Sequence, residues 1–393
     1  MESYKFLLDI AVILMATKAL GLLTERFYMP QVVGALLAGV LLGPAIFGVV
    51  QETNFIQSTA EVGVILLMFT AGMETDVAEL KACGRSALVI ALIGVIVPLF
   101  GGMGLMYIFN GPDMIASDAA CTELLQNIFV GVIFTATSVS ITVETLKEMG
   151  KLNTKSGNAI LAAAIIDDIL GIIALTIISS FAVDNISIVT VLIKIFAFFV
   201  VAGISGYAFY RIYILWFEKS KRRLRRHTIT AFVFCLLLSY SAEHFFGVAD
   251  ITGAYIAGVV IAAAGKGSLL SKKFEIASYL YFSPIFFASI GLKIQNIEVS
   301  SVMLVFVLAL TAVAVLTKIV GCGLGAKICG YNMKESVQIG TGMISRGEVA
   351  LIVMSKGVAM GLLGSAFVGP IALAVVITTI VTPILLKIVY HRD

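Results

Sequence analysis

The sequence predicts an all-helical protein that crosses a membrane many times. Of its 393 residues, 60% are hydrophobic and only 13% are charged, and the mean hydropathy is +1.05. A soluble domain is about 45–50% apolar and about a quarter charged. The apolar stretches are continuous and about 20 residues long, whereas strands of a membrane barrel alternate apolar and polar residues. Because lipid cannot satisfy free backbone groups, these stretches must be helices.

Thirteen apolar segments can be counted along the chain, and together they predict about 13 transmembrane helices in a single unit, 1–393. They fall at 6–23, 30–48, 60–75, 84–109, 124–146, 156–182, 187–213, 228–247, 250–264, 277–293, 300–328, 336–355 and 363–388.

The basic residues predict how these spans are oriented. If the N-terminus is outside, 20 of the 27 Lys and Arg fall in inside loops and three fall outside. Inside loops of membrane proteins carry such an excess. The predicted protein therefore has its N-terminus outside and its C-terminus in the cytoplasm.

Two pairs of segments repeat at a spacing of 219 residues. GALLAGVLL at 34–42 resembles GAYIAGVVI at 253–261, and Gly72 in MFTAGME matches Gly291 in FASIGLK. Seven spans separate the members of each pair, and an odd number reverses orientation. These are therefore inverted-topology repeats, which in secondary transporters meet at a site near the midplane. Chance similarity between Gly- and Ala-rich helices is the alternative.

Asp167 and Asp168 lie in the middle of the apolar run NAILAAAIIDDILGIIALTII. A charge there costs about 2.5–3.5 kcal/mol on insertion scales, so it marks function by default. Neighbouring side chains on a helix diverge by about 100°, so the two carboxylates can have different partners. Both cannot ionise cheaply in a dry site, so their titrations should be coupled. A site that holds either a proton or a cation is the basis of an exchanger; a helix-packing pair is the alternative.

Lys318 also lies inside an apolar span, in LTAVAVLTKIVGCGLGA. One of the two aspartates is its natural partner, because a buried charge needs an opposite charge. The alternative is that Lys318 extends toward the inside end of its helix.

Two spans contain polar interruptions typical of broken helices. VGVIFTATSVSI at 130–141 brings in Thr135, Thr137 and Ser138, and IGTGMISRGEVAL at 339–351 aligns with it at an offset of 209. We interpret both as discontinuous helices, one in each repeat, that cross at the site and offer carbonyl ligands to a cation. The hydroxyls could instead join ordinary helices to one another.

The second interruption carries Arg346 and Glu348, which are two residues apart and so do not face each other on a helix. They should seek partners on other helices, and Glu74 at the end of MFTAGME is a candidate partner for Arg346. A structural ion pair and a role in transport are equally open.

At these residues the sequence closely resembles the monovalent cation:proton antiporter-2 family, in particular its NapA-like and GerN-like bacterial Na+/H+ antiporters. The matching runs cover the whole chain: GALLAGVLLGP, LLMFTAGME, FTATSVSIT, ILAAAIIDDILG, SPIFFASIGLK and ISRGEVALIV, with Lys318 between the last two. The resemblance implies an NhaA-like fold of thirteen helices, elevator-type alternating access and a homodimer. It implies ion-translocation repeats over 60–182 and 277–388, with dimerisation, scaffold and linker helices in 1–59 and 187–264.

The resemblance also implies roles for individual residues. Asp168 resembles the main ligand of the cation and the proton, and Asp167 the residue that pairs with Lys318 when the ion is absent. Thr137, with the neighbouring Ser138 and backbone, resembles part of the crossing-helix site. An Asp–Asp pair is similar to that of the electrogenic members, which exchange two protons for one cation.

The expected function is therefore exchange of Na+, or of Li+ or K+, for protons across the inner membrane of a bacterial cell. The alternative is a K+/H+ antiporter, or a Kef-like K+ efflux system without its regulatory domain, because the chain stops at Asp393 soon after its last span. We expect membrane lipids as partners, and no cofactor, ATP, nucleic acid or enzymatic activity. The three histidines do not cluster, so no metal centre other than the monovalent-cation site at Asp168 is expected.

Overall fold

The computed structural model describes residues 4–27, 31–75, 77–111, 114–115, 117–180, 188–219, 224–293 and 301–391. Within these ranges, nine helices are long and apolar enough to cross a membrane. Four shorter apolar helices lie at 31–42, 123–133, 250–263 and 349–358. The predicted all-helical, multi-span architecture is confirmed, and the total of thirteen spans stays a prediction.

One group of helices packs around α3 and α12. Its members are α1 (Lys5–Arg26), α2 (Gln31–Leu42), α3 (Asn54–Glu74), α9 (Leu224–Ser241), α10 (Asp250–Ala263), α11 (Gly267–Ala277) and α12 (Ser283–Leu292). Two π-helical turns, η2 (Ala242–Phe246) and η3 (Ser278–Phe282), extend α9 and join α11 to α12. The expected span 30–48 yields a helix only as far as Leu42, after which the chain turns.

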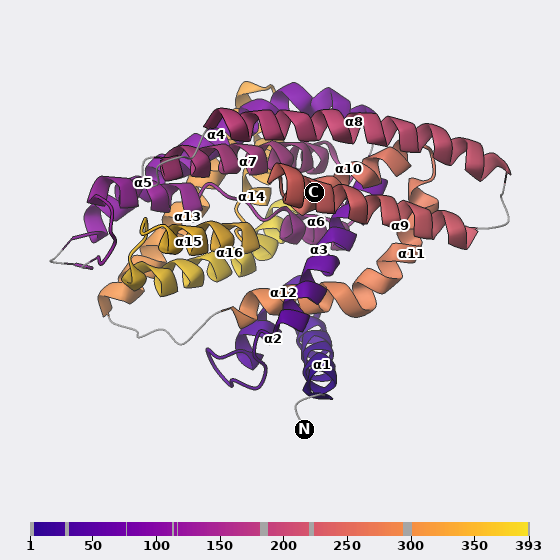
Figure 1. Cartoon of the computed structure of the whole chain (residues 1–393). Coiled ribbons are helices and arrows are strands. Elements are labelled where there is room, and N and C mark those ends of the chain that lie inside the picture. The colour runs from indigo at the N-terminus through magenta and orange to yellow at the C-terminus, as the bar shows by residue number, and fades with distance from the viewer. Residues whose placement is uncertain are drawn as a thin grey trace.

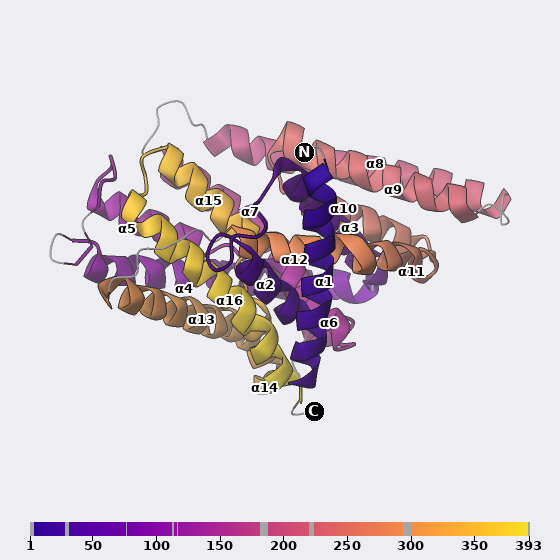
Figure 2. The same cartoon turned by 90° about the horizontal axis from the view of Figure 1, so that it is seen from below.

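A second group packs around α4 and α13. It contains α4 (Val77–Phe109), α5 (Glu123–Ile133), α6 (Val139–Glu148), α7 (Lys155–Ser180), α13 (Ser301–Ile328), α14 (Met333–Gly342), α15 (Glu348–Ala359) and α16 (Ser365–His391). In two perpendicular views, α5, α13 and α16 gather on one side of the molecule and α9 and α11 on the other (Figures 1 and 2). The long helix α8 (Ile188–Lys219) contacts α7 of this group and α9 and α10 of the first group.

The 219-residue repeat appears as two matching helix crossings. At Gly39 of α2, an added Cβ would lie 2.0 Å from the Ala288 carbonyl oxygen of α12. At Gly258 of α10, it would lie 2.3 Å from the Phe69 carbonyl oxygen of α3. Glycine is required in both places because the backbones approach too closely for a side chain. The same offset relates both partner helices, so each repeat packs its first helix onto the other repeat.

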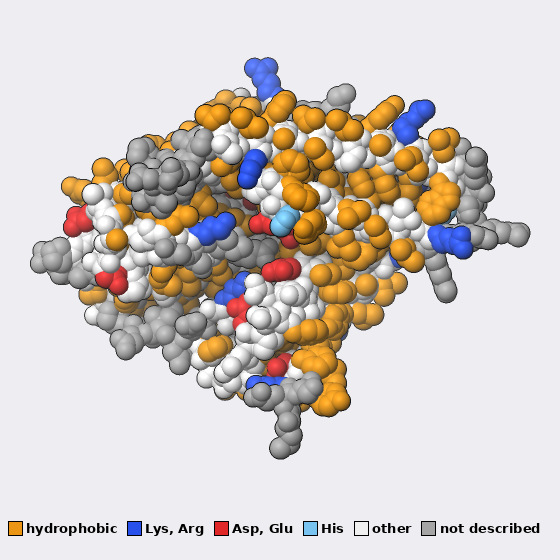
Figure 3. Space-filling model, in the orientation of Figure 1, with side chains coloured by type: hydrophobic (Ala, Val, Ile, Leu, Met, Phe, Trp, Pro, Cys, Tyr) orange, Lys and Arg blue, Asp and Glu red, His pale blue; other side chains and the backbone are white. Residues whose placement is uncertain are grey.

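The surface suits a lipid environment over much of its area. In the most apolar part of α1, α8 and α13, only 22–28% of the residues are buried inside the protein. Figure 3 shows a mostly apolar face on which acidic and basic side chains gather around a hollow near the middle. Charge is thus concentrated at that hollow, as expected of a protein that provides a polar path through an apolar body.

Candidate ion-binding site

Two broken helices cross in the middle of the second group of helices. The first break, residues 134–138, separates α5 from α6, and the second, residues 343–347, separates α14 from α15. The Ser138 amide donates to the Ser345 carbonyl at 2.7 Å, and the Ser345 hydroxyl donates to the Ser138 carbonyl at 2.6 Å. The two breaks are related by the predicted offset of 209 residues. The expectation of two crossing, discontinuous helices is therefore confirmed in geometry.

The breaks are held together by more than this one contact. The Thr142 hydroxyl of α6 donates to the Gly342 carbonyl at 2.7 Å, and the Thr137 hydroxyl donates to the Met343 carbonyl at 3.4 Å. At Gly347, an added Cβ would lie 2.6 Å from the Ser138 Oγ. Each irregular segment thus satisfies the carbonyls that the other leaves without a helical partner, as buried backbone requires.

Lys318 and Asp167 form a buried ion pair beside this crossing. The Lys318 Nζ lies 3.0 Å from Asp167 Oδ1 and 3.2 Å from Oδ2, and neither side chain is exposed. The predicted pairing is therefore present, and Lys318 does not extend to a helix end. Two charges removed from water are tolerable here because they neutralise each other.

Asp168 points elsewhere, as its position one residue further along α7 requires. Together with Asp167, it lines a cavity of about 330 Å³ that lies between the two groups of helices. Thr135 and Gly171 border the cavity near the aspartates, and its rim includes residues of the loops predicted to lie outside, namely Glu52, Lys293 and Lys356. Asp168 is 7% exposed and Asp167 is 1% exposed. The neighbouring carboxylates therefore share the cavity but differ in their partners: Asp167 is held in the ion pair with Lys318, and Asp168 is not part of that pair.

Arg346 takes partners that the sequence did not indicate. Its guanidinium donates to the Phe134 carbonyl at 2.9 Å and to the Ile344 carbonyl at 2.6 Å. These carbonyls follow the ends of α5 and α14, where the helix dipoles concentrate partial negative charge. One fully buried cation thus stabilises the ends of both broken helices. The sequence did hold a signal for these contacts: an arginine inside an apolar span next to helix breaks, where backbone carbonyls lack helical partners.

Glu74 does not pair with Arg346, which corrects that expectation. Its carboxylate lies 3.6 Å from the Lys147 Nζ, and the same ammonium lies 3.4 Å from Glu275. Glu74 ends α3 and so lies at the end of the molecule where α6 finishes, away from the centre of the crossing. The backbone of Glu348 begins α15, but its side chain lies outside the described part of the structure.

Two groups at the site escaped the sequence analysis. Ser345 bonds across the crossing to residue 138, and the Thr379 hydroxyl of α16 donates to the Arg346 carbonyl. The run TTIVT in an apolar span was the signal for the second, because Thr378 and Thr382 on the same helix are also fully buried. Within the described residues, no group of three or more His, Cys, Asp or Glu side chains could hold a metal ion.

Discontinuous helices that cross beside a buried charge are typical of secondary transporters. Residues 11–391 match the model of the transmembrane sodium/hydrogen exchanger family, and the chain belongs to that family. It is 38% identical to the Na+/H+-K+ antiporter GerN of Bacillus cereus, over 98% of this chain and 96% of that protein. It is 34% identical to a Na+/H+ antiporter of Enterococcus hirae, over 98% and 97% of the two chains.

The fold also matches a solved structure. The sodium/proton antiporter MjNhaP1 of Methanocaldococcus jannaschii superimposes with a TM-score of 0.70, over 98% of this chain and 97% of that one, at 18% identity. The predicted family is therefore confirmed, and the protein is a multi-pass membrane cation/proton antiporter. The family is one of transporters, not of enzymes.

Proposed function

We propose that this antiporter exchanges one Na+ for two protons, with Asp168 as the group for which they compete. The observation that carries the proposal is the difference between the two carboxylates. Both line the cavity, but Asp167 is neutralised by Lys318 at 3.0 Å, whereas Asp168 is outside that ion pair and is the more exposed of the two, at 7% against 1%. A carboxylate there can bind a proton or a cation, but not both. We propose that Thr137, Ser138 and the carbonyls of the crossing provide further oxygen ligands for the cation, of the kind that alkali cations prefer.

The transport cycle follows from the cost of charge in lipid. An empty, ionised Asp168 is costly to carry across the membrane, and either ion neutralises it. We propose an elevator-type motion of the helices that hold the crossing relative to the others. The repeats expected to move are 60–182 and 277–388. Because α3 packs on α10 and α12 packs on α2, we propose that α3 and α12, which open these two ranges, stay with the other helices and that the moving part begins after each of them.

The orientation and assembly belong to the same proposal. The cavity rim lies in loops that the charge bias places outside, which supports our proposal of an outward-facing state with the N-terminus outside and the C-terminus in the cytoplasm. We further propose a homodimer in a bacterial inner membrane, with 1–59 and 187–264 as its dimerisation, scaffold and linker region. These features rest on the positive-inside pattern and on the family resemblance.

K+ is the second candidate cation. GerN carries both Na+ and K+ in its name, and a K+/H+ antiporter of Saccharomyces cerevisiae is 30% identical over 99% of this chain and 47% of that protein. Oxygen ligands suit either ion, so the cation must be determined by measurement.

Exchange in proteoliposomes tests the proposal. A pH-sensitive dye inside the vesicles reports proton movement while Na+, Li+ and K+ are supplied in turn, with and without an imposed membrane potential. We expect Na+ to drive exchange, an inside-negative potential to accelerate cation efflux, and Asp168→Asn to reduce the signal to background. Glu123→Gln, at an exposed carboxylate in the first turn of α5, is the matched control. Exchange by Asp168→Asn at the wild-type rate would overturn the assignment, and indifference to potential would overturn the stoichiometry.

A further inference from the structure

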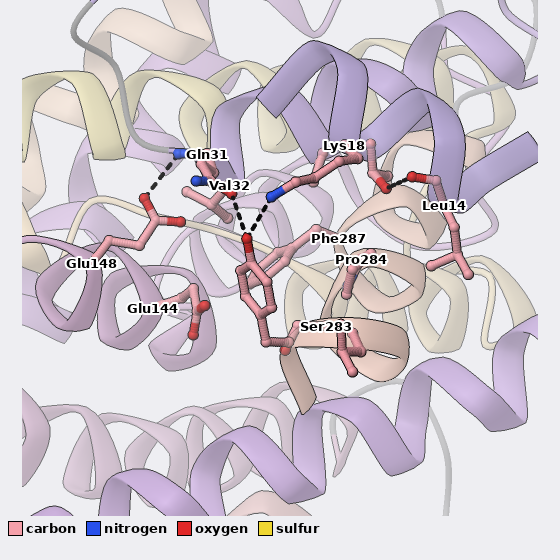
Figure 4. A pocket seen from close by; sticks show the side chains of 13 residues that line it. Leu14, Lys18, Gln31, Val32, Glu144, Glu148, Ser283, Pro284 and Phe287 are labelled. Atoms are coloured by element: carbon pink, nitrogen blue, oxygen red, sulfur yellow. Dashed lines mark hydrogen bonds between the residues drawn. The ribbon is translucent and has the colours of Figure 1, made fainter. Parts of the chain in front are cut away.

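A second cavity lies on the opposite side of the molecule from the rim of the aspartate cavity. It has a volume of about 310 Å³ and lies between α1, α2, α6 and the η3–α12 segment (Figure 4). Small-molecule sites typically have volumes of about 300–1,000 Å³. Neither aspartate lines it, so it is separate from the candidate ion site.

The cavity has an apolar wall that faces the lipid environment. Leu14, Val32 and Phe287 form part of that wall. Leu280 lines the cavity and is 64% exposed, and Tyr279 lines it and is 49% exposed. Both belong to η3, on the outside of the helix bundle. A hydrocarbon chain can therefore pass from the bilayer into the cavity without crossing a polar barrier.

Carboxylates form the polar end on one side. Glu144 and Glu148 project from α6 toward the space beside Gln31 (Figure 4). Glu148 accepts a hydrogen bond from the Gln31 amide at 2.8 Å, whereas the Glu144 carboxylate has no hydrogen bond or ion pair among the described residues. A half-buried carboxylate in this position is best neutralised by a cation that enters the cavity.

A cation of the protein stands across the cavity from these carboxylates. The Lys18 ammonium of α1 donates to the Tyr279 hydroxyl at 2.6 Å, and that hydroxyl lies 3.4 Å from the Gln31 side chain. An ammonium has three donors, so Lys18 can also bind an anionic group. The cavity therefore presents a positive group and a negative group across one space, above an apolar wall.

An adjoining cavity of about 400 Å³ enlarges the polar end. It shares Glu144, Glu148 and Tyr279 with the first cavity and continues to Lys147 and Glu275. A hydrated head group fits here, while the apolar part of the first cavity accommodates the glycerol backbone and the first carbons of an acyl chain.

We propose that this inner-side cavity binds a zwitterionic phospholipid with a primary ammonium, that is, a phosphatidylethanolamine. The ammonium lies against Glu144 and Glu148, and the phosphate lies against Lys18 and the Tyr279 hydroxyl. Charge-assisted hydrogen bonds to both groups provide the selectivity, since the choline ammonium has no N–H to donate and a glycerol head group has no positive charge. The bound lipid would join α6, which carries one half of the ion-site crossing, to α1, α2 and α12.

Lipid-dependent stability of the purified, delipidated protein tests the proposal without any transport measurement. Dioleoyl phosphatidylethanolamine, phosphatidylcholine and phosphatidylglycerol are added separately at equal concentration, and the melting temperature is followed, with the number of retained lipids counted by native mass spectrometry. We expect the ethanolamine lipid to raise the melting temperature by about 2–4 °C more than either other lipid. Equal effects of the three lipids, or a larger effect of phosphatidylglycerol, would overturn it.

Variants connect the effect to this cavity. Glu144→Gln should abolish the preference for the ethanolamine lipid, whereas Glu123→Gln, at an exposed carboxylate outside the cavity, should keep it. If Glu144→Gln does not fold, Leu280→Trp narrows the mouth and keeps every charge, and it should likewise remove the preference. A preference that survives both substitutions places the lipid elsewhere and refutes the site.

Discussion

The two broken spans share a backbone geometry but carry different charges. Both are interrupted over five residues, 134–138 and 343–347, and they bond to each other through Ser138 and Ser345. Yet among the described residues, the carboxylates of the site come from the first repeat, on α7. Both of its cations, Lys318 and Arg346, come from the second.

This difference shows that the backbone geometry is shared by the two broken spans, whereas the charges around them are not. The repeat builds a crossing whose helix ends point at one another, and opposite charges on the two repeats then hold the crossing together. The comparison predicts that substitutions at charged positions have unequal consequences in the two repeats, whereas substitutions at the helix crossings have equal ones.

The largest expected effect on stability comes from breaking the buried ion pair. Lys318→Ala leaves Asp167 as an unpaired buried charge, which costs about 3–5 kcal/mol and lowers the melting temperature in detergent. Adding Asp167→Asn removes the stranded charge and should recover much of the loss. Lys194→Ala, at an exposed lysine of α8, is the matched control and should change stability by less than about 0.5 kcal/mol. Equal melting temperatures for Lys318→Ala and the wild type would show that the pair does not hold the repeats together.

The second prediction concerns the shared helix ends. Arg346→Met removes two charge-assisted bonds, to the carbonyls of residues 134 and 344, and should cost about 2–3 kcal/mol. Arg346→Lys should lie between this variant and the wild type, because an ammonium lacks the planar fork that reaches both carbonyls. If chemical denaturation gives Arg346→Lys and Arg346→Met the same free energy of unfolding, the positive charge itself contributes little to stability.

The third prediction tests the two equivalent helix crossings, at Gly39 and Gly258. Gly39→Ala and Gly258→Ala each force a Cβ into the backbone of another helix, at 2.0 Å and 2.3 Å, and each should cost about 1–3 kcal/mol. The two losses should be similar, since the crossings are equivalent in the two repeats. Gly203→Ala on α8 should instead leave stability unchanged or improve it, because an added Cβ there would have no atom of another element within 4 Å. Thermal unfolding of the three variants distinguishes these cases, and a large inequality between the first two argues against equivalent packing.

The smallest expected effect is a pH-dependent contact between the repeats. Asp118 accepts hydrogen bonds from the Ser365 hydroxyl and from the Ser365 amide, both at 2.7 Å, at the start of α16. These bonds lower the pKa of the Asp118 carboxyl below its usual value. Its contribution is therefore complete at neutral pH, above the ordinary pKa, and is lost as the pH falls through the lowered pKa.

Melting temperatures measured from about pH 7 down to about pH 3 test this contact. Asp118→Asn should show a slightly weaker dependence on pH than the wild type, and Glu123→Gln should leave the dependence unchanged. An Asp118→Asn curve parallel to that of the wild type would contradict the prediction.

Much of the site was predictable because its residues are charged although the sequence around them is apolar. Asp167, Asp168, Lys318 and Arg346 each place charge inside an apolar span, and the offset of 209 aligned the two breaks. The partner of Glu74 was not predictable. Sequence spacing reveals which residues share a face of one helix, but which faces of different helices meet depends on their rotation and depth. Glu74 accordingly bonds to Lys147, at an end of the bundle, and not to Arg346.

The sequence by itself determined that this protein is a membrane-spanning helical antiporter with charges inside its spans, because hydropathy and the placement of charged residues and motifs are properties of the linear chain. Only the tertiary structure decided which of the two neighbouring aspartates pairs with Lys318. A one-residue step rotates a side chain by about 100°, and the helices packed on either side of α7 determine what each carboxylate meets. Asp167 pairs with Lys318, and Asp168 lines the same cavity from outside that pair.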